Sequence, residues 1–410
     1  MAQNERAVIA RPDDEATRAA FSFVLLVGVL SFFADFTYEG SRSIVGPYLG
    51  SLGASAALIA AVAGFGELLG YALRLVSGRF ADATGKFWPT AIAGYLVQMA
   101  SVPALALTGS WGTAAILIIL ERVGRAIRNP PRDFMLSNAG KRMGGYGWVF
   151  GLHEAMDQCG AMFGPLAVSA VLARRGNYRE AFATLLVPAL FNLLFLGIAR
   201  WRYPRPQDLE VASSVIEGEA LPRVFWVYLA GSVLVAAGFV DYPLIAYHLS
   251  KTDIAPGAWV AVFYSVAMAV SGGGSVLFGR LFDRHGFAVL ILLTTFAASF
   301  APLVFLGNFW VALAGAAIWG LGMGVHESII PAAVSPMVRP ERRASAFGLF
   351  TAGYGIFWFL GSVVIGELYE VSIAATIGFC VVCELAAVPI FIWVARHTRT
   401  GRPTLARPSS

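Results

Sequence analysis

The chain has 410 residues, of which 57% are hydrophobic and 13% are charged, and its formal net charge is +5. The charged share is about half that of an ordinary soluble domain, so the chain lacks the polar side chains that would cover a water-exposed surface. This composition excludes a soluble globular protein and indicates a protein embedded in a lipid bilayer.

Long apolar segments follow one another along the chain almost without gaps. Each has about 20 residues, the length of helix that crosses the hydrocarbon core of a bilayer. None has the short apolar–polar alternation of a membrane barrel strand. The sequence therefore predicts an all-α membrane protein with twelve transmembrane helices. In chain order we expect them at residues 19–45, 53–77, 88–108, 112–136, 146–172, 180–199, 223–249, 256–278, 287–306, 309–335, 344–368 and 372–395.

An eight-residue motif occurs twice, half a chain length apart, and each copy lies between two apolar segments. Its shared residues are Gly78, Arg79, Asp82 and Gly85 in the first copy and Gly279, Arg280, Asp283 and Gly286 in the second. This is the pattern of a duplicated membrane bundle, and it predicts two pseudo-symmetric six-helix bundles. Because the motif recurs, we expect it to contribute to gating; the alternative is a tight turn without a mechanical role.

The predicted bundles are joined by a segment with the composition of a surface linker. It contains Pro204, Pro206 and Pro222 together with several charges, which is typical of a connection between packed units. We expect a tail at 1–18, bundles at 19–199 and 223–396, a linker at 200–222, and a second tail at 397–410.

Basic residues indicate the orientation in the membrane. Most of the Lys and Arg outside the helices lie in the two tails and the even-numbered loops, and the odd-numbered loops hold only Arg174, Arg175, Arg179 and Lys251. Basic residues stay on the cytoplasmic side, so we expect both termini to be cytoplasmic in a multi-pass protein of the plasma (inner) membrane. The first eighteen residues are polar and are expected to be a tail, not a signal peptide. The positive charge is explained by this sidedness and does not indicate a nucleic-acid partner.

Several predicted helices carry charged residues, which are costly in hydrocarbon and usually functional. Asp35, Glu39 and Arg42 share one face of the first helix, and Glu67 and Arg74 lie in the second.

The fourth predicted helix is the most basic. It contains Arg122, Arg125 and Arg128, and Pro130 and Pro131 lie in the next turn. Since proline lacks a backbone donor, we expect these two residues to break the backbone hydrogen-bond ladder where the arginines cluster.

The remaining intramembrane charges lie in the fifth, seventh and tenth helices. We expect proton-coupling residues among the acids and the arginine nearest to them: Asp35, Glu39, Glu67, Arg122, Glu154, Asp157 and Asp241. Asp35 is the preferred proton carrier because it lies at mid-membrane depth and is mirrored by Asp241. Substrate-binding candidates are the other polar and aromatic residues of these helices: Phe36, Tyr38, Arg42, Arg125, Arg128, His153, His326, Glu327 and Trp358. The alternative for each residue is a structural ion pair.

With these motifs the chain resembles the major facilitator superfamily over nearly its whole length. The repeated motif is similar to the family's loop signature. Arg122 stands where the family's helix-4 motif has its arginine, and Arg125 is the alternative for that position. Gly151, Gly160, Gly164 and Pro165 resemble the helix-5 motif of the antiporter branch, while Val168 and Ser169 replace that motif's last glycines. The resemblance implies two bundles that alternate access to a central cavity, and export coupled to inward proton flow.

The function that we expect is proton-coupled efflux of a small amphipathic or anionic organic molecule by a monomer that needs no cofactor or metal. One alternative is proton-coupled uptake of an organic anion. Alternatives of another class are a non-transporting sensor, or an intramembrane metalloenzyme in which His153 and Asp157, one turn apart, hold the metal. The chain contains no phosphate-binding loop with the Gly-x4-Gly-Lys-Ser/Thr pattern, which argues against direct drive by ATP.

Overall fold

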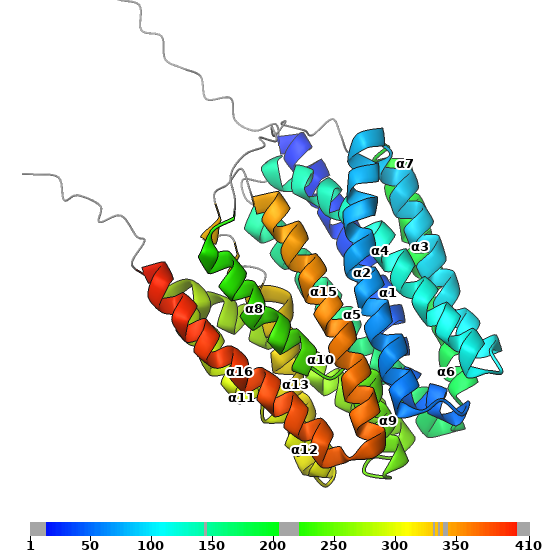
Figure 1. Ribbon diagram of the computed structural model, residues 1–410. Coiled ribbons are helices and arrows are strands. Elements are labelled where there is room, and N and C mark those ends of the chain that lie inside the picture. Colours follow the sequence, from blue (N-terminus) through cyan, green and yellow to red (C-terminus); the bar gives the residue numbers. More distant parts are fainter. Residues whose placement is uncertain are drawn as a thin grey trace, which may run out of the picture.

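The computed structural model describes residues 14–142, 146–204, 221–330, 333–334, 337–338 and 343–399. Within these ranges, the side chains of residues 14–17, 19, 82, 137–142, 146–151, 283, 327–328, 343–345 and 399 are not described. The described part of the chain is built from helices (Figure 1).

The helices of the first half of the chain run to residue 202. They are α1 (Asp14–Ser51), α2 (Ala56–Thr84), α3 (Phe87–Ala104) with the 3-10 turn η1 (Leu105–Leu107), α4 (Trp111–Arg142), α5 (Tyr146–Arg175), α6 (Tyr178–Thr184) and α7 (Leu186–Arg202).

The second half begins at residue 223. Its elements are α8 (Arg223–Gly238), α9 (Tyr242–Lys251), α10 (Gly257–His285), α11 (Phe287–Ala297), α12 (Phe300–Leu306), α13 (Phe309–Gly324) with the π-helical turn η3 (Val325–Ile329), α15 (Arg343–Val371) and α16 (Ile373–Arg399).

These elements form the twelve spanning segments of an all-α membrane protein. Ten helical segments in the described ranges are long and apolar enough to cross a bilayer, and α13 is a shorter apolar helix. The remaining segment is α4, whose 32 residues are long enough but carry many charges. The prediction of an all-α membrane fold is therefore confirmed.

Three predicted helices are divided in the structure. Segment 180–199 is divided at Leu185, segment 223–249 between Gly238 and Tyr242, and segment 287–306 at Ala298 and Ser299. Apolar composition is the same on both sides of each break, so the hydropathy pattern alone gave no sign of them.

Helix α4 continues through Pro130 and Pro131, in agreement with the predicted segment 112–136. Proline in a membrane helix is tolerated when neighbouring helices and local adjustments compensate for the missing donor. Here Gly78 of α2 faces Pro130, with ordinary contact distance between the proline ring and the place where a Cβ of residue 78 would lie.

Close helix packing is achieved with small residues. Gly160 and Gly164 of α5 lie directly against the backbone of Phe32 and Phe36 on α1, where no side chain would fit. Small residues at such positions let two membrane helices approach closely. The two described glycines of the antiporter-like motif therefore hold α5 against α1.

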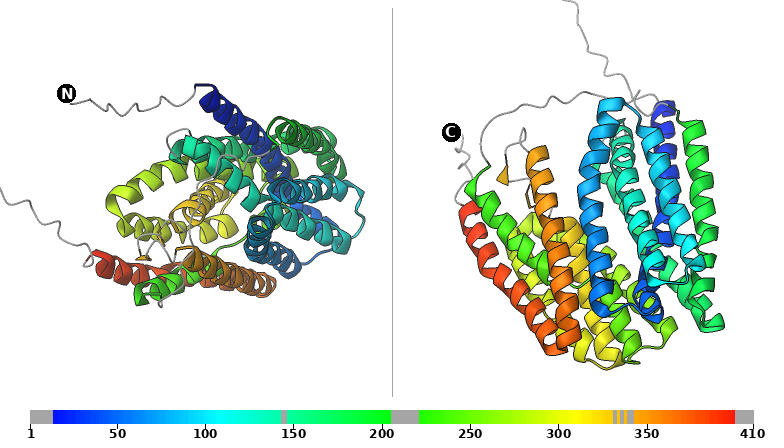
Figure 2. Two further views of the ribbon diagram at one scale, coloured as in Figure 1. Left: turned by 90° about the horizontal axis from the view of Figure 1, so that it is seen from above. Right: turned by 45° about the vertical axis from the view of Figure 1, so that its right-hand side comes forward.

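The two halves of the chain lie side by side (Figure 2). They meet where α2 packs on α15, α5 on α10 and α1 on α9. Gly64 of α2 contacts Ser362, Gly46 of α1 contacts the backbone of Pro243, and Gly366 of α15 contacts Ala57. The halves are thus joined through several tight helix crossings.

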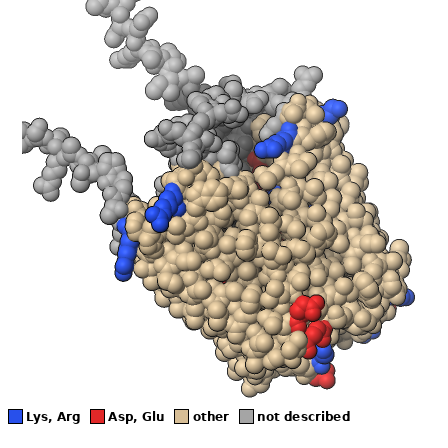
Figure 3. Space-filling model, viewed as in Figure 1, with Lys and Arg blue, Asp and Glu red and all other residues tan. Residues whose placement is uncertain are grey.

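The surface is that of a membrane protein. On the face drawn in Figure 3, Lys, Arg, Asp and Glu gather toward the two ends of the helices, and a broad band between them is uncharged. Trp201 at the end of α7 and Trp310 at the start of α13 are 83% and 72% exposed. Exposed tryptophan near helix ends is typical of the membrane–water interface.

The membrane orientation predicted from the basic residues can be tested by cysteine labelling. Cys159 is exposed and Cys380 and Cys383 are buried, so all three are first replaced by alanine. Single cysteines at Ser51, Ser110 and Thr252, which are exposed residues next to helix ends, should react with an impermeant maleimide added to intact cells. A cysteine at Thr84, at the end of α2, should react only after the membrane is opened. The reverse labelling pattern would contradict cytoplasmic termini.

Candidate functional site

A buried arginine joins the two halves of the chain. The Nη2 atom of Arg42 on α1 lies 3.4 Å from Oε1 of Glu67 on α2 and 3.3 Å from Oδ1 of Asp241, which precedes α9. The side chains of Arg42 and Asp241 are 5% and 1% exposed. A charge pair this deep in a membrane protein is costly unless its members remain paired, so the geometry of the two halves is tied to this contact.

Asp241 receives two further hydrogen bonds from α15. Trp358 donates its Nε1–H to Oδ2 at 2.9 Å, and the Ser362 hydroxyl donates to the same oxygen at 3.2 Å. One carboxylate oxygen thus faces the second half and the other faces Arg42 of the first half.

The break between α8 and α9 positions this carboxylate. Helix α8 ends at Gly238, which packs against Cys383 of α16 without room for a side chain, and Asp241 is extended at φ −68° and ψ 140°. The free backbone carbonyl of Val240 accepts a 2.7 Å hydrogen bond from Trp319 Nε1. Because this hydrogen bond satisfies a carbonyl that the helix break leaves free, non-helical backbone is tolerated in the membrane interior. The Asp241 side chain makes no cap hydrogen bond and is available to Arg42.

Glu67 extends the network into α4. Its Oε1 atom lies 2.8 Å from Nη1 of Arg122, whose Nε lies 3.6 Å from Glu121. Glu121 accepts a 2.9 Å hydrogen bond from Gln98 of α3. Gln98 in turn accepts from Arg128 at 2.5 Å.

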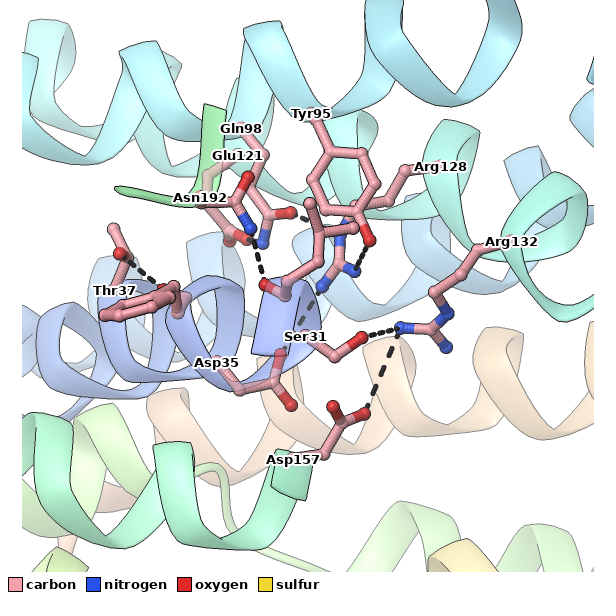
Figure 4. Close-up of polar contacts among 12 residues, drawn as sticks. Ser31, Asp35, Thr37, Tyr95, Gln98, Glu121, Arg128, Arg132, Asp157 and Asn192 are labelled. Carbon is pink, nitrogen blue, oxygen red and sulfur yellow. Dashed lines mark hydrogen bonds and ion pairs between the residues drawn. The ribbon is translucent and has the colours of Figure 1, made fainter. Parts of the chain in front are cut away.

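Arg128 brings the network to Asp35. Its Nη2 atom lies 3.4 Å from Oδ1 of Asp35, and its Nη1 donates to the hydroxyl of Tyr95 at 3.1 Å (Figure 4). Asp35 therefore lies in the first half beside α4, whereas its predicted counterpart Asp241 lies between the halves. The two aspartates are ends of one chain of polar contacts.

A second polar cluster lies near Asp35 in Figure 4. Arg132 lies 3.9 Å from Asp157 and 2.8 Å from Asp133, and His153 lies 3.5 Å from Asp157 and 2.7 Å from the Ser31 hydroxyl. In the described part of the chain, no third metal-ligating residue joins His153 and Asp157.

Aromatic side chains border the network. The ring of Tyr38 lies 5.9, 4.8 and 4.3 Å from the guanidinium carbons of Arg42, Arg122 and Arg125. In the second half, His326 in the π-helical turn hydrogen-bonds to Tyr354 at 2.6 Å, and its ring lies against that of Trp358. Of the predicted substrate-binding residues, Arg42 and Trp358 therefore contact Asp241, and Tyr38 lies beside Arg42.

Other predicted residues lie elsewhere. Glu154 is exposed and accepts a hydrogen bond from Gln158, and Phe36 packs on Phe32 and α5. The side chain of Glu327 lies outside the described residues, as do any contacts of Gly151.

The repeated motif contributes two sharp turns. Gly85 and Gly286 adopt φ values of 65° and 61°, which glycine adopts without strain. Arg79, Arg280 and Arg284 are exposed. The side chains of Asp82 and Asp283 lie outside the described residues, so the gating role of the motif stays a prediction.

Sequence reasoning missed the neutral partners of the network. Tyr264 of α10 donates to Oε2 of Glu39 at 2.5 Å, and Gln98, Ser362 and Trp319 satisfy other groups as described above. Tyr264 and Trp319 occupy apolar runs and give no sequence signal of a polar role. A polar residue such as Gln98, with an amide in the middle of a membrane helix, was a signal that could have been used.

The geometry defines the class of the protein. A multi-pass helical protein with a discontinuous helix and a polar network between its two halves has the organisation of a membrane transporter. A model of the Major Facilitator Superfamily matches residues 24–362 and 242–408. The chain belongs to this superfamily, and it is a non-enzymatic membrane transporter of that type. The resemblance inferred from the sequence motifs is confirmed for the superfamily.

Individual relatives agree. The chain is 38% identical over 382 residues to an uncharacterized protein of Mycobacterium tuberculosis, covering 91% of this chain and 93% of that protein. It is 23% identical to an uncharacterized transporter of this superfamily from Methanocaldococcus jannaschii, covering 88% and 92%. Its fold is similar to the crystal structure of the peptide transporter POT in complex with sulfate, with a TM-score of 0.73, 14% identity and coverage of 92% and 94%.

The buried pair can be tested against an exposed pair in the same chain. Arg42→Met leaves Asp241 buried without its cation, while Glu67 keeps Arg122, and breaking a buried pair typically costs about 3–5 kcal/mol. Arg175→Met removes the 2.9 Å pair with Glu180, whose side chains are 67% and 43% exposed, and should cost at most about 1 kcal/mol. Thermal unfolding of the purified proteins in detergent should show a large decrease in melting temperature for Arg42→Met only. Adding Asp241→Asn to Arg42→Met should recover part of the loss; equal melting temperatures for Arg42→Met and Arg175→Met would contradict the assignment.

Proposed function

We propose that the protein is a proton-coupled exporter of a small amphipathic or anionic organic molecule that works by alternating access. The observation that carries this proposal is Arg42, which is held between Glu67 of the first half and Asp241 of the second. A group that binds both halves through a titratable carboxylate couples proton occupancy to the contact between them.

The coupling follows from the charge balance at Arg42. When Asp241 takes up a proton, its attraction to Arg42 falls, and Arg42 keeps Glu67 as its partner within the first half. The ion pair between the halves is lost while no arginine is left without a counter-charge. Proton uptake at Asp241 therefore favours separation of α1 from α9, and proton release favours their contact.

Asp35 remains a second proton-coupling candidate. Asp35 contacts Arg128. A chain of hydrogen bonds and ion pairs through Gln98 and Glu67 leads from Arg128 toward Asp241. We propose that protonation of Asp35 weakens its 3.4 Å contact with Arg128 and frees this arginine to bind another anion.

Export is favoured by the antiporter-like residues of α5. Gly160 and Gly164 set a close crossing of α5 on α1, and Pro165 follows inside the same helix. We propose that this crossing flexes during the transport cycle. The alternative is uptake by proton symport. In symport the substrate and the protons cross the membrane in the same direction, whereas in proton-coupled export they cross in opposite directions.

A vesicle experiment tests coupling and direction together. Inside-out membrane vesicles carrying the protein are given an acidic interior, and a pH-sensitive dye reports proton leakage as each compound of a charge-diverse panel is added. An exported compound should dissipate the pH gradient and accumulate inside. Accumulation that is unchanged by a protonophore would contradict proton coupling, and acidification of the vesicle interior when the compound is added would indicate symport.

Asp241→Asn should abolish proton-driven accumulation, because the variant cannot exchange a proton at the contact between the halves. It should retain substrate exchange between two equal pools, which needs no net proton movement. Asp35→Asn should behave in the same way if Asp35 also carries a proton. Wild-type accumulation in the Asp241→Asn protein, at matched expression, would rule this residue out; Asp253→Asn, at an exposed position after α9, is the control.

Arg122→Lys should keep the fold but slow turnover, and Arg122→Ala should lose transport. Arg122 holds Glu67 at 2.8 Å while its guanidinium lies on Tyr38, and lysine has neither the planar group nor the several donors. Transport rates normalised to protein in the membrane measure the effect. Full activity of Arg122→Ala would mean that α4 only stabilises the bundle.

A further inference from the structure

Two arginines near the network differ from the others in their partners. Arg42, Arg122, Arg128 and Arg132 each lie within 4.0 Å of a carboxylate oxygen. Among the described residues, Arg74 of α2 and Arg125 of α4 form no such ion pair, and each has a buried Nε atom without a hydrogen-bond acceptor.

The two arginines lie on facing turns of α2 and α4. The Ser77 hydroxyl donates to the backbone carbonyl of Ala126 at 2.8 Å, and this bond joins the helices one turn after Arg74 and one residue after Arg125. Two cations are thus held close together in the membrane interior, which is unfavourable without an anion between them.

Arg74 and Arg125 also differ from the paired arginines in their exposure. Arg74 and Arg125 are partly exposed, whereas Arg42, Arg122 and Arg128 are buried. A ligand can therefore reach Arg74 and Arg125 without breaking an ion pair.

Aromatic rings line the same place. Arg125 lies 4.3 Å from the ring centre of Tyr38, and Arg74 lies 5.8 Å from that of Tyr71. Tyr71 packs edge-on against Tyr354 of the second half. The Tyr38 hydroxyl is buried and has no hydrogen-bond partner in the described part of the chain, so it can donate to an incoming acceptor.

We propose that Arg74, Arg125 and the Tyr38 hydroxyl form the anion-binding part of the substrate site, and that the substrate is an organic carboxylate or phosphate with an apolar or aromatic body. Guanidinium groups bind these anions through paired hydrogen bonds, and the rings of Tyr38 and Tyr71 contact the body. This assignment rests on the proposed transport function and adds to it the chemical class of the substrate and a role for Arg74.

The site can be tested with probes that differ only in charge. Purified protein in phosphatidylcholine nanodiscs is treated with phenylglyoxal, which modifies arginine, in the presence of phenyl phosphate, benzoate, benzyl alcohol or benzylamine. Mass spectrometry should show that the two anions protect Arg74 and Arg125, and that the alcohol and the amine do not. Arg202 is exposed at the end of α7 and should be modified equally in every sample. Because this measurement uses the wild-type protein, it does not depend on the folding of a variant.

Variants then measure the contribution of each arginine. Phenyl phosphate should raise the melting temperature of the wild-type protein and of Arg202→Gln in a saturable way. Its apparent affinity should fall about tenfold in Arg74→Gln and in Arg125→Gln, the loss expected for one charge-assisted contact. Equal protection by benzylamine, no protection by either anion, or unchanged affinity in both variants would overturn the proposal.

Two further results separate this inference from the general function. If cationic or neutral compounds are transported in the vesicles while anions give no protection, the substrate class is wrong and the transport function stands. If anions protect both arginines but no compound dissipates the pH gradient, the anion site stands and proton coupling fails. Protection by phosphatidylglycerol alone, placed in the nanodisc without added anion, would support the anion site and assign it to a lipid headgroup.

Discussion

Burial of Arg42 is the constraint on which the relation between the two halves depends. A guanidinium in a bilayer costs about 3 kcal/mol or more when it lacks a partner, so Arg42 must remain beside a carboxylate in every state of the protein. Here it has two, Glu67 from its own half and Asp241 from the other. If Arg42 loses its contact with Asp241 in the other half, it is still paired with Glu67 in its own half.

The break between α8 and α9 is a consequence of the same constraint. A continuous helix would direct the carboxylate of residue 241 along a regular helical face, whereas the extended segment presents it to Arg42 on one side and to Trp358 on the other. The break frees backbone groups in the membrane interior, and Trp319 satisfies one of them. Large aromatic residues of the second half therefore serve as hydrogen-bond donors as well as packing groups.

Composition and periodicity predicted the membrane segments because bilayer thickness and the cost of an unpaired backbone leave few alternatives. They also placed Asp35, Glu39 and Arg42 correctly on one helix face, yet the three residues have separate partners. Asp35 and Arg42 are seven residues apart, which is about 10 Å along a helix, so Asp35 reaches Arg128 while Arg42 reaches Asp241. The helical period determines the direction in which each side chain points from the helix axis. It does not determine which residue that side chain meets, because the partners belong to helices far away in the sequence.

The helix breaks and the proline positions were harder to predict for a related reason. Pro130 and Pro131 lie inside α4, which continues through both residues. The break at residues 239–241 lies between Gly238, the last residue of α8, and Pro243 in the first turn of α9, and Trp319 binds the freed carbonyl of Val240. Proline therefore accompanies a continuous helix in one case and a broken helix in the other, so the residue alone does not decide between them.

The distribution of charge between the halves has a mechanical consequence. The first half contains the buried arginines and most of their acids, and the second half meets this network mainly with neutral groups such as Tyr264, Trp358 and Ser362. Among the described residues, Arg42–Asp241 is the one ion pair that crosses between the halves. Neutral hydrogen bonds and helix packing change little when a proton binds, whereas this pair loses its charge attraction. Under the proposed mechanism, protonation of Asp241 would therefore weaken the contact between the halves by removing this ion pair.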